Sequence, residues 1–390
     1  EVQLLKLEIS EEVEAFRASF RSWLSSNPPP EATNDAGLEN FIEQGRQWQS
    51  KLASGGWVGV HWPKEYGGRS LSLVEEAVIQ EELVRVSSPQ LLGLFGLTMV
   101  GPVLIKHGTA EQKLRFLSKI LSAQEIWCQG FSEPGAGSDL AAIKTRARVS
   151  EDGFYISGQK VWTSFAHIAD WCFVLCRTSE EKKKHEGLSY LLVDMKSPGI
   201  STRPLRQMSG DDEFNEVFFD EVFVPKENIV GEIGDGWRIA ISTLMYERVV
   251  LTFARQLQSE VALRQLIEQV GRESDLVRQK ALAHELATAC AVRALAYEHL
   301  LAYSGGKSPG PEGSLDKLFW SESFQSISKL AREVRGHLGA LDETSKESGV
   351  ETHRYLYSRG RTIAAGTSEI QRNIIAERIL ELPRFRYTES

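Results

Sequence analysis

Apolar residues recur at helical spacing through the first third of the chain. In residues 11–26 the apolar positions fall on one helical face. Residues 90–106 are apolar on nearly every side, which is typical of a buried helix. Thr109 followed by Gln112 is the sequence of a capping box, which begins a helix. The pattern predicts an N-terminal α-helical domain over residues 1–124.

The pattern then changes to short runs of β-branched and aromatic residues. Turn signals such as Asp152-Gly153 and Pro198-Gly199 separate the runs. The connections are too short for helical crossovers, so we expect an antiparallel sheet or barrel over residues 125–235. The predicted strands are Ile126–Phe131, Phe154–Ser157, Trp171–Cys176, Leu188–Val193 and Glu216–Val224.

Helical periodicity returns after the β region and continues towards the end of the chain. The predicted helices are 238–270, 274–303, 315–340 and 368–380. They form a C-terminal α-helical bundle domain over residues 236–390. The order of helices, β unit and helices predicts an α+β fold.

Composition narrows the classes of protein that this chain can represent. Its 390 residues include 53 acidic and 45 basic side chains, a net charge of −8 that argues against nucleic-acid binding. No apolar run reaches the roughly 18 residues of a membrane span. The four cysteines form no C-x-x-C pair, and no signal peptide is visible, so we expect a reducing, cytoplasmic compartment. A targeting segment removed before residue 1 remains open.

The glycine-rich segment Cys128–Asp139 is the strongest local candidate for chemistry. It follows a predicted strand, and such a turn can present backbone N–H groups to an anion or a carbonyl. Ordinary turn formation would also explain it. The chain has no P-loop, no G-x-G-x-x-G, no G-x-S-x-G and no Cys/His spacing for a metal, so no metal site is expected.

Several motifs, in order along nearly the whole chain, resemble the acyl-CoA dehydrogenase family. They are Trp62–Gly68, Phe131–Asp139, Gly158–Ser164, Phe218–Pro225 and Ala365–Arg372. The resemblance implies the family fold, with an N-terminal helical domain, a middle antiparallel β domain and a C-terminal helical bundle. It also implies FAD as the cofactor and an acyl-CoA as the substrate.

The resemblance assigns roles to particular residues. Around the flavin ring it implies Gln129, Phe131, Ser132, Trp162 and Ser164, although simple core packing of Trp162 remains open. The full implied set is, for the cofactor, Gln129, Phe131, Ser132, Gly137, Ser138, Trp162, Thr163, Ser164, Thr367 and Glu369, and for the substrate, Ser138, Arg248 and Gly366.

The base that removes the α-proton is the main departure from the family pattern. Many members have a glutamate where this chain has Ala365, and a methyl group cannot accept a proton. A branch that includes isovaleryl- and long-chain-type members carries the base on the first long helix of the C-terminal domain. The resemblance to that branch implies Glu247 as the catalytic base and Arg248 beside the substrate. Without the resemblance, the two would read as a surface charge pair.

The implied reaction is α,β-dehydrogenation to the trans-2-enoyl-CoA, with the β-hydride passing to flavin N5 and an electron-transfer flavoprotein as acceptor. It belongs to fatty acid β-oxidation or other lipid metabolism, and a branched or bulky acyl group, such as a steroid side chain, is possible.

The family's R-x-x-F-G segment has no counterpart at 264–278, and its glycine-rich stretch is weak at 336–339. Both a homo-oligomer and a mixed-chain dimer or tetramer therefore stay open. So do a FAD-binding subunit without turnover and an oxygen-using oxidase or monooxygenase.

Overall fold

The computed structural model describes residues 10–30, 38–270, 275–305, 307, 310–334, 336 and 348–384. The side chains of residues 38, 246–253 and 348–350 fall outside this description. The chain divides into two compact units: Ala15–Glu247 forms one, and Arg248–Ser390 with the first residues, Glu1–Glu14, forms the other.

Helices open the chain, as the periodicity predicts. They are α1 (Glu11–Ser26), α2 (Leu38–Ser54), α3 (Leu73–Arg85), α4 (Gly101–His107) and α5 (Ala110–Leu121), with a 3-10 turn η1 (Lys64–Tyr66) and a π-helical turn η2 (Gly96–Val100). The predicted capping box is confirmed, because Thr109 Oγ1 accepts from Gln112 N at 3.2 Å and Thr109 N donates to Gln112 Oε1 at 3.1 Å.

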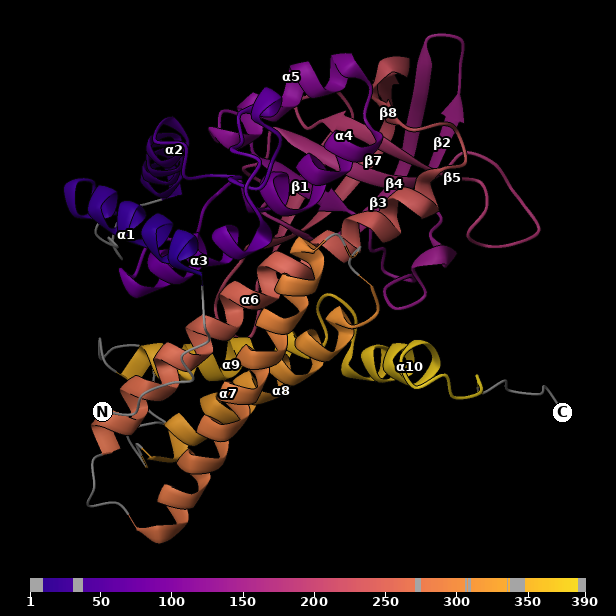
Figure 1. Cartoon of the computed structure of the whole chain (residues 1–390). Helices are drawn as coiled ribbons and strands as arrows, with labels where there is room; N and C mark the ends of the chain where they lie inside the picture. The colour runs from indigo at the N-terminus through magenta and orange to yellow at the C-terminus, as the bar shows by residue number, and fades with distance from the viewer. Residues whose placement is uncertain are drawn as a thin grey trace, which may run out of the picture. The chain divides into compact units, whose positions relative to one another are not determined.

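One eight-stranded sheet follows the helices (Figure 1). Its strands run in the order β6-β7-β3-β2-β4-β5-β8, and β1 pairs with β4. The strands are β1 (Trp127–Gly130), β2 (Arg146–Val149), β3 (Gly153–Ser164), β4 (Trp171–Arg177), β5 (Leu188–Asp194), β6 (Ile200–Leu205), β7 (Phe214–Pro225) and β8 (Ile229–Val230), with 3-10 turns η3 (Leu140–Ala142) and η4 (Lys226–Asn228). All five predicted strands are present, whereas β2, β6 and β8 were not predicted.

The sheet is not purely antiparallel, which corrects the expectation. β1 and β2 both pair with β4 in parallel, while the remaining pairs are antiparallel. The β2–β3 hairpin lies between β1 and β4 in sequence, and this connection is long enough to bring the chain back in the same direction. Phe116 of α5 packs edge-on against Trp127 and Trp171, which places α5 against these two strands.

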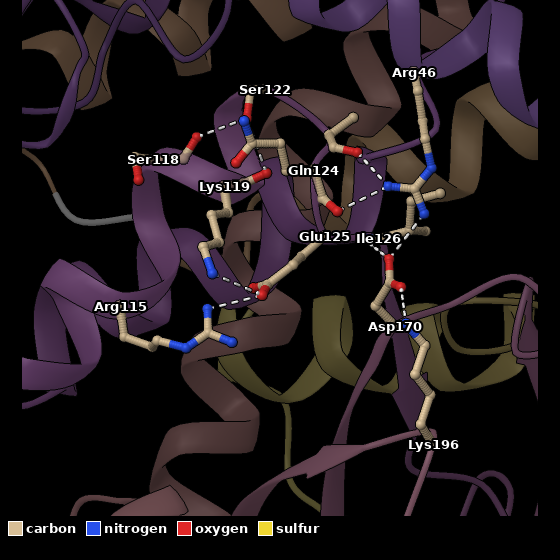
Figure 2. Close-up of polar contacts among 11 residues, drawn as sticks. Arg46, Arg115, Ser118, Lys119, Ser122, Gln124, Glu125, Ile126, Asp170 and Lys196 are labelled. Carbon is tan, nitrogen blue, oxygen red and sulfur yellow. Dashed lines mark hydrogen bonds and ion pairs between the residues drawn. The ribbon is translucent and has the colours of Figure 1, made fainter.

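A polar network ties the helices to the beginnings of β1 and β4 (Figure 2). Arg46 of α2 donates to Asp170 Oδ2 at 2.9 Å and to the carbonyl oxygens of Ala123 and Gln124. The same Asp170 oxygen accepts the backbone N–H of Ile126 at 3.0 Å. One carboxylate therefore holds a helix and the entry to a strand together.

The second unit is helical. Its elements are α7 (Leu276–Ser304), α8 (Gly313–Val334), α9 (Ser348–Arg361) and α10 (Ser368–Arg378), together with most of α6 (Gly236–Val270), which continues from the first unit. The described part of α8 ends at Val334, before the predicted residue 340, and α9 was not predicted. Their core includes Leu263, Leu266, Leu282, Ala289, Ile327 and Leu330. No helix among the described residues is long and apolar enough to cross a bilayer.

Candidate active site

Backbone bonds bring the turn after β1 against the end of β3. Val161 N donates to the carbonyl of Ser132 at 2.9 Å. Next to it, Lys160 Nζ donates to the carbonyl of Phe131 at 3.0 Å. The two glycine-containing motifs found in the sequence, at residues 131–139 and 158–164, are thereby joined in one place.

A β-bulge at this point turns Trp162 outward. Lys160 lies opposite Val217 and Thr163 lies opposite Asn215, so β3 contains one residue more than β7. The extra residue allows Trp162 to adopt a left-handed backbone with φ of 59°. Its indole is 59 % exposed, so Trp162 does not belong to the core. The alternative of simple core packing is therefore wrong.

Thr163 of the bulge and Gln129 of β1 each have a buried polar atom without a partner among the described residues. Gln129 Nε2 and Thr163 Oγ1 make no hydrogen bond within the described part of the chain. An unsatisfied buried group costs about 1–3 kcal/mol, so such atoms are typical of a place where a ligand supplies the partner. The resemblance implies both residues as cofactor contacts, and Thr163 directly follows the exposed Trp162.

The other implied residues of this unit have different surroundings. Phe131 is only 4 % exposed, and its ring packs edge-on against Phe173 and Tyr190. The ring of Phe131 is therefore largely held by the core. Ser132 and Ser164 are half-buried, whereas Gly137 and Ser138 are exposed. Nothing lies within 4 Å of a Cβ built at Gly137, so there is open space beside this turn.

The C-terminal motif forms the entry to α10. Thr367 is its N-cap, because Thr367 Oγ1 accepts from Ile370 N at 3.2 Å. Gly366 has φ of 91°, a conformation that favours glycine. Gln371 Nε2 donates to the carbonyl oxygens of Ala365 and Gly366, so a side chain of α10 holds the turn in place. Exposed Glu369 accepts from its own backbone N–H and from Thr367, which lowers its pKa.

Some predicted positions have no described side chain. Glu247 and Arg248 belong to α6, but their side chains lie outside the described residues. Residues 271–274 and 337–339, which belong to the segments compared with the family's R-x-x-F-G and glycine-rich motifs, lie entirely outside the described residues. Among the residues that the structure does describe, no group of three His, Cys, Asp or Glu is placed to hold a metal ion.

Sequence reasoning missed two buried residues of this site. Glu133 and Lys160 lie inside the quoted motifs, yet neither received a role. A lysine directly before two apolar residues, Val161 and Trp162, in one of the motifs was the signal that could have found Lys160, because a lysine buried with its strand needs a partner.

Three family models match successive parts of the chain. The acyl-CoA dehydrogenase N-terminal domain matches residues 10–124, the middle domain matches 128–222 and the C-terminal domain matches 234–380. A curated relative, acyl-CoA dehydrogenase IpdE1 of Mycolicibacterium smegmatis, is 41 % identical over 96 % of this chain and 98 % of its own length. The chain belongs to the acyl-CoA dehydrogenase family.

Solved structures agree with the fold of this acyl-CoA dehydrogenase. The structure titled Tcur3481-Tcur3483 steroid ACAD has a TM-score of 0.85 and 27 % identity, covering 98 % of this chain and all of that one. The ChsE4-ChsE5 complex from Mycobacterium tuberculosis has a TM-score of 0.83 and 29 % identity, with the same coverage. The predicted fold of helical, β and helical domains is confirmed. The family uses FAD, and the relatives from Mycolicibacterium smegmatis and Mycobacterium tuberculosis are bacterial.

Proposed function

We propose that this acyl-CoA dehydrogenase binds FAD and oxidises the Cα–Cβ bond of a branched or bulky acyl-CoA, with Glu247 as base. The observation that carries the proposal is the exposed indole of Trp162 directly before Thr163, whose buried Oγ1 has no partner among the described residues. Gln129 Nε2, on the strand that leads into the adjoining turn, likewise has none among them. An apolar aromatic face with hydrogen-bonding atoms beside it matches the edge and face of an isoalloxazine. The residues present therefore fit the cofactor.

Each residue of the site has a definite task in this proposal. Trp162 packs against the ring, while Gln129, Ser132, Thr163 and Ser164 offer polar atoms to its edge. Gly137 and Ser138 leave room at the exposed turn for the cofactor and the CoA portion. In the other unit, Gly366, Thr367 and Glu369 occupy the start of α10, whose N–H groups favour negatively charged oxygens such as phosphates. When bound, FAD supplies the acceptor for the β-hydride.

Glu247 is the proton acceptor in this proposal. Ala365, at the position of the base in many relatives, has no titratable group. A carboxylate in a pocket that excludes water becomes a stronger base, because desolvation raises its pKa towards neutrality. Arg248, the next residue, would hold the substrate, and hydrogen bonds to the thioester carbonyl would stabilise the enolate that forms.

The substrate and the assembly follow from relatives rather than from this chain's own contacts. Two of the similar structures are titled as a steroid ACAD and as a ChsE4-ChsE5 complex. These titles support a steroid acyl group, which we propose to be a steroid side chain, and a mixed-chain assembly. The family resemblance in turn implies an electron-transfer flavoprotein as acceptor. The family matches also support our proposed division into domains at 1–124, 125–235 and 236–390.

The test uses purified protein and a panel of acyl-CoAs, with and without a co-expressed partner chain. Under anaerobic conditions, a substrate should bleach the flavin absorbance. Glu247→Gln should retain FAD but lose bleaching, whereas Glu268→Gln, an exposed carboxylate on the same helix, should bleach normally. An unimpaired rate in Glu247→Gln would remove Glu247 from its role. Rapid reoxidation by oxygen would favour an oxidase, and absence of bleaching by every acyl-CoA would favour a subunit without turnover.

A further inference from the structure

A buried ion pair joins β3 to the turn that carries Ser132. The side chain of Lys160 is completely buried, and its Nζ lies 2.8 Å from Glu133 Oε1. Its aliphatic stem is enclosed as well, since a Cβ built at Gly130 would stand 3.5 Å from Lys160 Cγ and 3.0 Å from Cys172 Sγ. The Lys160 ammonium is therefore shielded from water.

The carboxylate of Glu133 accepts hydrogen bonds from two backbone N–H groups. Oε2 accepts from Lys144 N at 2.6 Å and Oε1 accepts from Thr145 N at 2.9 Å. The backbone of Glu133 also exchanges two hydrogen bonds with Ala136, at 3.1 and 3.0 Å, which closes the glycine-rich turn. The carboxylate thus connects this turn with the segment that leads into β2.

Lys160 connects the same turn with the bulge. Its ammonium donates to the carbonyl of Phe131 as well as to Glu133, and the next residue, Val161, donates to Ser132. Trp162 follows at once in the left-handed conformation. Lys160 and Val161 therefore make three hydrogen bonds with the turn, and the next residue presents the indole.

The energetics of such a pair favour a role in geometry over a role in stability. Taking two charges out of water costs several kcal/mol for each ion, and apolar residues of similar volume often replace a buried pair with no loss of stability. Burial raises the pKa of Glu133, but the Lys160 ammonium and the backbone donors lower it by more than burial raises it. The carboxylate therefore stays charged. Burial lowers the pKa of Lys160, and Glu133 offsets this in part. The hydrogen bonds of the pair fix distances that apolar contacts would leave adjustable.

We propose that Glu133 and Lys160 are positioning residues of the cofactor site. Through the Phe131 carbonyl and the turn, they set the spacing between Ser132 and Trp162, and hence the width of the site that a flavin ring would enter. This inference rests on the proposed function, because it requires that Trp162 and its neighbours hold FAD. It adds that the affinity for FAD depends on two side chains that do not touch the cofactor.

The test compares four variants of the full chain, together with any partner that co-purifies. Lys160→Met and Glu133→Gln each remove one charge, and the double variant removes both while keeping similar volume. The matched control is Glu82→Gln, which removes another buried carboxylate of the same unit, 1 % exposed and bound to arginines of α1 and α3. The readouts are the Kd of the apoprotein for FAD, the visible circular dichroism of the bound flavin and the Tm.

We expect Lys160→Met and the double variant to bind FAD about 10- to 100-fold more weakly, the range known for supporting residues behind metal ligands. The flavin dichroism should change in both. The double variant should recover most of the Tm that the single variants lose, but not the affinity. If Lys160→Met does not fold, the double variant provides the test. Glu82→Gln should lower the Tm and leave the Kd and the dichroism unchanged.

Two results would overturn the inference, and they are distinguishable. If the wild-type chain binds FAD and the double variant matches its Kd and dichroism, the pair has no positioning role while the proposed function stands. If the wild-type chain takes up no FAD at all, the proposed function fails and the positioning role fails with it.

Discussion

The indole of Trp162 meets the ring of Phe214 edge-on, with centroids 5.8 Å apart and planes at 88°. This is the only ring contact of Trp162 among the described residues. A residue other than glycine held in an unfavourable backbone conformation costs about 1–3 kcal/mol, and the exposed indole regains little of this by burial. The site therefore loses some stability in order to present an aromatic face.

Trp162→Gly tests this relationship between strain and binding. Glycine adopts the left-handed conformation without cost, and this gain offsets the loss of an edge-on contact worth about 0.5–1.5 kcal/mol. We expect the free energy of unfolding of the apoprotein to change by less than about 1 kcal/mol, in urea denaturation. FAD binding should weaken strongly, as measured by flavin absorbance after desalting.

Ser87→Gly is the control for strain alone. Ser87 is exposed and has φ of 52°, so the substitution relieves the same type of conformation after α3. It should leave FAD binding unchanged. A Trp162→Gly protein that unfolds far more easily than the wild type, or that keeps its full flavin content, would show that the indole serves the fold.

The carboxylate of Glu82 should make stability depend on pH. It is 1 % exposed and accepts hydrogen bonds from three arginines, Arg17, Arg21 and Arg85. Burial raises its pKa, but the arginines lower it more, so the folded pKa lies below the unfolded one. The stability that this charge contributes is then fully present above the unfolded pKa, near 4.5, and is lost as the pH falls through the folded pKa.

Glu82→Gln should therefore lower the free energy of unfolding by about 3–5 kcal/mol at pH 7, the usual cost of breaking a buried pair. The difference from wild type should shrink as the pH falls below about 4.5. Urea denaturation at several pH values gives this comparison. Glu43→Gln, an exposed carboxylate on α2, should change stability little at any pH. A gap that stays constant down to pH 3 would contradict the assignment.

Local sequence patterns predicted much of the fold. The Thr109–Gln112 capping box and the five apolar strands were found because their signals lie within a few residues. β6 was missed because its central residues are exposed and include Pro204, so no apolar alternation marks it. α9 was missed because its sequence, SGVETHRYLYSRGR, is polar around most of the helix.

The exposure of Trp162 could not be predicted from its neighbours in sequence. The bulge exists because Lys160 and Thr163 pair with Val217 and Asn215, more than fifty residues away, and that pairing is decided by the whole sheet. The motif resemblance located the segment, but the conformation came from long-range register. The sequence signals Lys160 as a lysine that needs a partner, but only the fold shows that this partner is Glu133.

Asp170→Asn tests the network between α2 and the sheet in Figure 2. Burial raises the pKa of Asp170, but the Ile126 N–H and Arg46 lower it more, so the aspartate is charged at neutral pH. Loss of these charge-assisted bonds should cost about 1.5–3 kcal/mol in urea denaturation. Lys196→Met should cost less than about 1 kcal/mol, because the Lys196 side chain is 79 % exposed. Equal losses in the two variants would rule out a dominant role for the buried contacts.

Gly366→Ala and Ala365→Gly form a matched pair at the entry to α10. A Cβ at Gly366 would stand 2.6 Å from Gln371 Nε2, and its φ of 91° disfavours any side chain. Gly366→Ala should therefore lower the Tm. Ala365 has φ of 57°, so Ala365→Gly removes strain worth roughly 1 kcal/mol and should raise the Tm slightly.

The same two variants also test whether Glu247 is the base. They change the turn at Ala365, where many relatives carry a glutamate, without adding or removing a titratable group. If Glu247 accepts the proton, Ala365→Gly should keep the wild-type rate of anaerobic flavin bleaching, since only a methyl group is lost. Gly366→Ala should slow bleaching, because it displaces Gln371 and the turn that this side chain holds at Ala365. A large loss of rate in Ala365→Gly, with FAD retained, would show that the methyl group shapes the substrate pocket.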